Sequence, residues 1–233
     1  MTNDGLPRNA IAAALALLAW LGSAAVATAS GVSVRVTARD GKPVADVAVY
    51  AVPKAFAQSA APAEPSRTRP PVEATMDQRD HAFVPHVLIV ETGTLVHFPN
   101  NDAVSHHVYS FSPTRSFELP LYKGTLHPPL PFDTPGLVTL GCNIHDDMLG
   151  YILVVDTPYF AKTDAHGMAL FDELPEGSYS VNVWTPRLPP RALPEAEQVT
   201  VTRVARESLE FGFDERLAPA HDDSESTLTW YPY

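Results

Sequence analysis

Residues 137–155 read LVTLGCNIHDDMLGYILVV, two apolar runs on either side of a short polar segment. The runs at 137–141 and 151–155 are rich in β-branched and aromatic residues, which is typical of strands. The segment between them carries a thiol, an imidazole and a thioether, at Cys142, His145 and Met148. A loop between neighbouring strands can point all three side chains at one metal ion. The stretch therefore predicts a β-protein with a metal site at the end of a strand pair.

Short alternating apolar runs continue along the rest of the chain, separated by turns that contain Gly and Pro. They lie at 32–37, 47–51, 83–90, 94–98, 107–111, 168–171, 179–184, 199–204 and 209–213. Beyond the N-terminal segment, no run shows the 3.6-residue periodicity of a helix. Short strands at this spacing indicate an all-β sandwich.

The composition limits the class of partner and of metal site. The 233 residues include 23 prolines and a single cysteine, and the formal net charge is −11. This acidity argues against nucleic acid and anionic membranes as partners, because both attract a basic surface. One cysteine excludes an intramolecular disulfide and a zinc site with two or four thiolates.

The N-terminus predicts export. An apolar run at 10–21 follows Arg8, and Ala27-Thr28-Ala29 fits a signal-peptidase site, so we expect residues 1–29 to be a signal peptide. The alternative is an uncleaved membrane anchor. With cleavage the protein is periplasmic in a Gram-negative cell and has no membrane segment. Because that compartment is oxidising, the unpaired thiol of Cys142 is a liability unless it is bound, for example to a metal ion.

The cysteine segment is one ligand short of a trigonal metal site. Either His106 or His107, which follow the polar segment 100–102 at a strand end, is the obvious source. Two imidazoles, a thiolate and a long axial thioether form the blue-copper ligand set. Zinc is disfavoured because a thioether is a poor zinc ligand. The residues therefore predict one copper ion.

At this point the sequence resembles the cupredoxins, with a ligand-loop spacing similar to that of amicyanin-type members. The resemblance covers about residues 72–157, and the stretch 117–145 is similar to exported cupredoxins labelled methylamine-utilisation-like. The motifs that carry it are FVPHVLIVETG at 83–93, VHFPNND at 96–102, HHV at 106–108, PG at 135–136 and CNIHDDM at 142–148.

The resemblance implies a Greek-key β-sandwich that holds one type 1 copper ion. It makes His106, Cys142, His145 and Met148 the ligands, with Met148 axial. It assigns to His107 a backbone N–H that supports the cysteine sulfur, although most cupredoxins carry Asn there. It also makes His145 the exposed edge through which electrons leave.

The flanks of this region are similar to the two halves of a transthyretin-like, carboxypeptidase-regulatory sandwich. The matching stretches are VSVRVT at 32–37, DGKPVADVAVY at 40–50, TDAHG at 163–167, LPEGSY at 174–179 and VNVW at 181–184. We expect the cupredoxin domain, 72–157, to be inserted into a sandwich formed by 30–52 and 158–213. A Pro/Ala-rich linker at 53–71 and a flexible acidic tail at 214–233 complete the division. Alternatively, 32–52 adds strands to the cupredoxin.

The leading hypothesis for function is a periplasmic one-electron carrier that is not an enzyme. Its partner would be a c-type cytochrome or a dehydrogenase with a basic or mixed-charge surface. The alternative is a copper-binding or cell-envelope interaction module without a redox role. A second metal site at His86 and His97 is a further option. The remaining histidines, at 81, 127, 166 and 221, are expected to be solvated.

Overall fold

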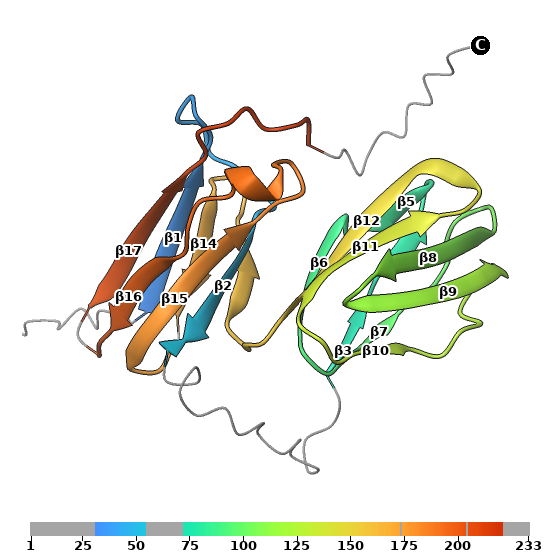
Figure 1. Cartoon of the computed structure of the whole chain (residues 1–233), viewed down its shortest axis with the longest axis horizontal. Coiled ribbons are helices and arrows are strands. Elements are labelled where there is room, and N and C mark those ends of the chain that lie inside the picture. The colour runs from blue at the N-terminus through green and yellow to red at the C-terminus, as the bar shows by residue number, and fades with distance from the viewer. Residues whose placement is uncertain (1–30, 55–71, 173, 204, 221–233) are drawn as a thin grey trace, which may run out of the picture.

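The computed structural model describes residues 31–54, 72–172, 174–203 and 205–220, and these residues are almost entirely β-structure (Figure 1). The all-β class predicted from the sequence is confirmed. The predicted signal peptide, most of the predicted linker and the end of the predicted tail lie outside the described residues. Within the described ranges, no helix is long and apolar enough to span a membrane.

Seven strands from the two ends of the chain form one sandwich, which we call the split sandwich. One sheet has the order β14 (Met168–Phe171), β1 (Gly31–Thr37), β17 (Arg206–Gly212). The other has the order β13 (Phe160–Lys162), β2 (Ala48–Pro53), β15 (Gly177–Trp184), β16 (Glu197–Val201). A short 3₁₀ helix, η2 (Pro190–Ala192), precedes β16. The sheet partners of β1 and β2 are therefore strands that follow residue 159.

The alternating pattern of β1 explains this arrangement. Val32, Val34 and Val36 are fully buried, because every second side chain of a strand points to the same face. They pack with the inward residues of β2, β15 and β17, such as Val49 and Phe211. Ala218 exchanges two hydrogen bonds with Arg187, so the chain stays attached to this sandwich beyond β17.

The strands between 73 and 155 form a second sandwich, which we call the continuous sandwich. Its five-stranded sheet has the order β6 (Val87–Glu91), β12 (His145–Val155), β11 (Gly136–Cys142), β8 (His106–Ser112), β9 (Arg115–Tyr122). A three-stranded sheet has the order β10 (Leu130–Phe132), β7 (Thr94–His97), β3 (Glu73–Thr75). β4 (Asp77–Arg79) pairs with β5 (Ala82–Val84).

Two strand predictions need correction. The expected strand at 83–90 is two strands, β5 and β6, which are interrupted at Pro85 because proline has no N–H for a ladder. The expected loop at 142–148 is only a two-residue turn, because β12 begins at His145 and already pairs with Cys142. His145 and Met148 are therefore strand residues, and their positions are fixed by the sheet.

A small apolar cluster joins the two sandwiches where they lie side by side (Figure 1). Ala48 of β2 packs with Leu153 and Val155 of β12, and all three are buried. At the edge of this cluster, the rings of Tyr151 and Trp184 lie 5.6 Å apart between centroids. The end of β12 thus contributes to the contact, while its beginning carries the site described next.

Candidate metal centre

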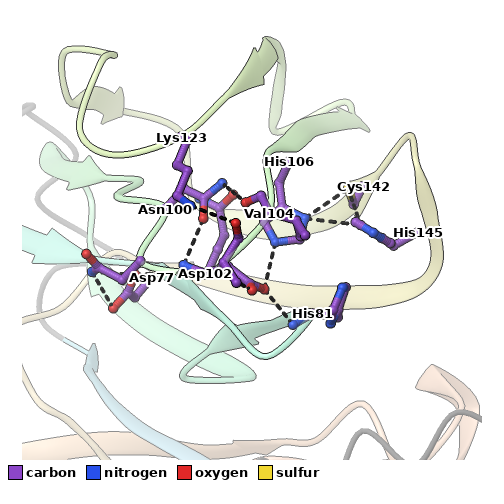
Figure 2. A network of polar contacts seen from close by, with 12 residues as sticks. Asp77, His81, Asn100, Asp102, Val104, His106, Lys123, Cys142 and His145 are labelled. Atoms are coloured by element: carbon purple, nitrogen blue, oxygen red, sulfur yellow. Dashed lines mark hydrogen bonds and ion pairs between the residues drawn. The ribbon is translucent and has the colours of Figure 1, made fainter.

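Three strands of the five-stranded sheet each bring one potential ligand to the same end of the continuous sandwich (Figure 2). His106 is the first residue of β8, Cys142 the last of β11 and His145 the first of β12. β11 pairs antiparallel with both neighbours, so the ends of these strands meet at one edge. A register shift between Gly141 and Cys142 marks a bulge, an irregularity that re-aims side chains next to functional sites.

The donor atoms of these three residues face one another. Nδ1 of His106 lies 3.1 Å from Nδ1 of His145. Sγ of Cys142 lies 3.7 Å from Nδ1 of His106 and 3.6 Å from Nδ1 of His145. In the part of the chain that the structure describes, these residues are the only group of three or more His, Cys or acidic side chains that could hold a metal ion, and their ligand atoms lie within 4.8 Å of one another.

These separations fit a trigonal metal ion. With metal–nitrogen bonds of about 2.0 Å and metal–sulfur bonds of about 2.3 Å, neighbouring ligand atoms in a trigonal plane lie about 3.5–3.7 Å apart. The two sulfur–nitrogen distances match this range, and the nitrogen–nitrogen distance is slightly shorter. A thiolate with two imidazoles is a donor set that suits copper. The residues present therefore fit a copper ion.

Burial differs among the three candidate ligands. His106 is fully buried and Cys142 is 4% exposed, whereas His145 is only partly buried at the rim of the site. Burial lowers the pKa of His145, and the neighbouring rings of His106 and His81 lower it further. A lowered pKa keeps this imidazole neutral, which is the form that binds a metal ion.

Met148 is buried in the same apolar cluster as Cys142. It lies on β12, three residues after His145, and is 2% exposed. Its role as the axial ligand stays a prediction.

The neighbouring histidine, His107, points elsewhere. Adjacent residues of a strand face opposite sides of the sheet, so only one of the pair can face Cys142. Nε2 of His107 lies 2.7 Å from Oε1 of Glu118, and His106 is the residue that joins the ligand group. The carbonyl of His107 accepts a hydrogen bond of 3.0 Å from the N–H of Asn143. This bond ties β8 to the turn after Cys142, and the predicted N–H support of the sulfur stays a prediction.

A buried carboxylate, Asp102, stands behind His106. Its Oδ2 lies 2.9 Å from Nε2 of His106 and accepts a 2.7 Å hydrogen bond from the N–H of His81. Burial opposes ionisation of this carboxyl, but hydrogen bonds from His81, His106 and the N–H of Ala103 outweigh it and lower its pKa to about 2. Asp102 is therefore an anion at neutral pH.

His81 also belongs to this region, contrary to the expectation of a solvated loop residue. Its ring centroid lies 4.7 Å from that of His145 and 5.9 Å from that of His106, both edge to face. Asp80 and His81 both have positive φ, which turns the chain sharply between β4 and β5 and brings His81 to the site. The sequence pattern of this turn, Arg79-Asp80-His81, gave no indication of such a conformation.

The structure places His86 and His97 beside different neighbours. The His86 ring packs edge to face against Tyr151, whereas Nε2 of His97 lies 3.1 Å from Oε2 of Glu73. His97 and His127 line an open surface cavity with Glu73, away from the Cys142 group. Among the described residues, no group of three or more potential metal ligands includes His86 or His97, and a second site there stays a prediction.

Comparisons with known proteins give likenesses in structure. Neither models of protein families nor curated proteins match the chain. A reduced mutant of amicyanin is similar to 38% of this chain over 87% of its own, at 21% identity and a TM-score of 0.34. A copper-containing nitrite reductase from Thermus scotoductus is similar at 25% identity and a TM-score of 0.36, over 38% of this chain and 24% of its own. A purple cupredoxin from Nitrosopumilus maritimus is similar at 19% identity and a TM-score of 0.31, over 36% and 99%.

Proposed function

We propose that the protein is a type 1 copper protein that carries one electron at a time. The observation that carries the proposal is the convergence of Cys142 Sγ with two imidazole Nδ1 atoms at 3.1–3.7 Å from one another. Soft thiolate sulfur selects copper over harder ions, and imidazole suits both of its oxidation states. A copper ion held there would supply a one-electron couple.

The chain's contribution is a ligand set held in place by strands. His106 and Cys142 are buried at strand ends whose ladders continue into the core, so these side chains have little freedom to move when the charge of the site changes. Met148, which is buried in the same apolar cluster as Cys142, would be the fourth residue to hold the metal. His145 is the least buried of the three and would be the edge through which electrons pass to a partner.

The remaining parts of the proposal concern the setting. An exported, periplasmic protein agrees with the N-terminal sequence, and the net charge of −11 suits a basic or mixed-charge partner such as a c-type cytochrome or a dehydrogenase. The proposal gives the chain no catalytic residue. The split sandwich, which we propose to be the transthyretin-like module, would serve for docking.

A visible spectrum of the copper-loaded, oxidised protein tests this function. We expect a strong thiolate-to-copper charge-transfer band that bleaches on reduction and returns on oxidation. Cys142→Ser should abolish the band completely, because the hydroxyl that replaces the thiolate is a hard ligand. His107→Ala is the matched control for His106→Ala: the first should keep the band and the second should lose it.

Two results would contradict the proposal. A colourless protein that still binds copper would favour a copper carrier or an interaction module without a redox role. A band that survives His106→Ala but disappears in His107→Ala would show that the ligand assignment is wrong.

A further inference from the structure

The imidazole of His106 uses both ring nitrogens, and one of them contacts a buried charge. Nδ1 faces Cys142 and His145, while Nε2 lies 2.9 Å from Oδ2 of Asp102. The side chain of His106 is unexposed and that of Asp102 is 4% exposed. Oδ2 of Asp102 already accepts the N–H of His81 and Oδ1 accepts the N–H of Ala103, so the carboxylate acts as an acceptor and Nε2 of His106 is the donor. Nδ1 is then the nitrogen with a free lone pair.

The other histidine of the group lacks such a partner. His145 also directs Nδ1 at Cys142, but its Nε2 has no hydrogen-bond partner among the described residues. The two imidazoles therefore differ in the hydrogen bonding of Nε2. One is fixed by a carboxylate in the interior, and the other lies at the rim.

The carboxylate of Asp102 is itself held in a fixed orientation. Its Oδ2 also accepts the N–H of His81, and its Oδ1 accepts the N–H of Ala103. Its own N–H donates to Oδ1 of Asn100 over 2.9 Å, and the amide of Asn100 donates to the carbonyls of Val104 and Tyr122 (Figure 2). The carboxylate is thus positioned by two backbone N–H groups, those of His81 and Ala103, and Asp102 needs no movement to receive His106.

We infer that Asp102 is a positioning residue that fixes the tautomer of His106 and favours the oxidised metal ion. This inference rests on the proposed copper site. A carboxylate that accepts the outer N–H of a ligating imidazole orients the ring and makes its other nitrogen a stronger donor. A stronger donor and a nearby negative charge both stabilise Cu(II) more than Cu(I). Asp102 therefore lowers the reduction potential of the site without touching the metal ion.

Asp102→Asn tests the inference, with Asp77→Asn as the matched control. Asp77 is a second buried carboxylate of the same polar region, bonded to Arg79 and Asn101 but not to His106. The reduction potential of both copper-loaded variants is measured against the unmodified protein. We expect Asp102→Asn to lower the ratio of Cu(II) to Cu(I) affinity about tenfold or more, an upward shift of about 59 mV per tenfold for one electron. Asp77→Asn should change the ratio less than twofold.

Nitrogen-15 NMR of the unmodified protein in its Cu(I) form gives a second readout, which is independent of any variant. The Nε2–H of His106 should exchange slowly with water and resonate downfield of that of His145, because it is buried and bonded to an anion. If Asp102→Asn does not fold or does not take up copper, this measurement decides.

The inference is overturned by an unchanged potential in Asp102→Asn, by equal shifts in both variants, or by a fast-exchanging Nε2–H on His106. The proposed function is tested separately. A protein without the charge-transfer band contradicts the proposed function, whereas a blue protein whose potential ignores Asp102 contradicts only this inference.

Discussion

The two sandwiches bury different kinds of side chain. The core of the split sandwich consists of apolar residues, and the buried polar groups beside it are threonines whose hydroxyls bond to the backbone, as Thr163 does to the carbonyl of Val44. The continuous sandwich buries two carboxylates, two amides and an imidazole. These residues are Asp77, Asp102, Gln78, Asn100 and His106.

This difference distinguishes residues that form a core from residues that support the candidate metal centre. Buried polar groups destabilise a fold unless each of them is hydrogen-bonded, so a sandwich needs none of them in order to fold. The split sandwich forms around an apolar core to which alternating strand residues contribute. In the continuous sandwich, by contrast, the buried polar residues reach the candidate metal centre through the contact of Asp102 with His106.

The largest expected loss of stability comes from a large-to-small substitution in the core of the split sandwich. Phe211 is 2% exposed in its core, and Phe211→Ala should lower the free energy of unfolding by about 3–5 kcal/mol. Chemical denaturation followed by far-UV circular dichroism measures this loss. In the folded fraction, the visible band of the copper-loaded protein should stay unchanged. A lost or shifted band would show that the two sandwiches are coupled.

The loss of stability at alkaline pH should come mainly from the continuous sandwich. Burial raises the pKa of Tyr122 to about 12, and its hydroxyl donates to the carbonyl of Phe98 and accepts from Gln78. Between pH 10 and 12 the unfolded chain loses this proton while the folded chain keeps it. The free energy of unfolding should therefore fall through that window, by about 3 kcal/mol for two pKa units.

Denaturation at a series of pH values measures this fall, and Tyr122→Phe should remove it. The matched variant in the split sandwich is Tyr179→Phe, since burial also raises the pKa of Tyr179. Tyr179→Phe should reduce the alkaline loss of unfolding free energy by less than Tyr122→Phe does. Equal slopes in the two variants would contradict a special role of the Tyr122 network.

Gly→Ala substitutions should change the free energy of unfolding by a smaller amount, and by different amounts in the two sandwiches. A Cβ added at Gly150 of β12 would lie 2.8 Å from Cβ of Phe83, whose side chain is fully buried. Gly150→Ala should therefore destabilise by about 1–3 kcal/mol. Gly212 of β17 has nothing within 4 Å of such an atom, so Gly212→Ala should stay within about 0.5 kcal/mol. Thermal denaturation of both variants tests the contrast, which fails if Gly150→Ala is equally neutral.

The sequence predicts the fold best where burial alternates. The valines of β1 and the apolar end of β12 are readable because one face of each is apolar. By contrast, β9 escapes prediction because Arg115–Tyr122 contains a proline and buries only Leu119 and Tyr122. The start of β12 was also missed, since His145, Asp146 and Asp147 look like a loop until their pairing with β11 is known.

The convergence of His106, Cys142 and His145 could be predicted because the candidate chemistry is concentrated in rare residues. A single Cys with a His three positions later points to a metal, and the period-2 geometry of a strand allows only one of His106 and His107. The supporting residues could not be predicted. Asp102 is recognised only by its contact with Nε2 of His106 in the folded chain. His81 reaches the site through the positive φ of a turn, which no side-chain pattern marks.

The sheet order also has a consequence for shortened chains. Among the described residues, every sheet partner of β3–β12 lies between residues 73 and 155, whereas β1 and β2 pair only with strands that follow residue 159. A chain that stops before Phe160 therefore contains all the strands of the continuous sandwich together with two apolar strands that have no neighbours. Unpaired strand edges of this kind template aggregation. A fragment intended to isolate the metal site should begin after residue 53.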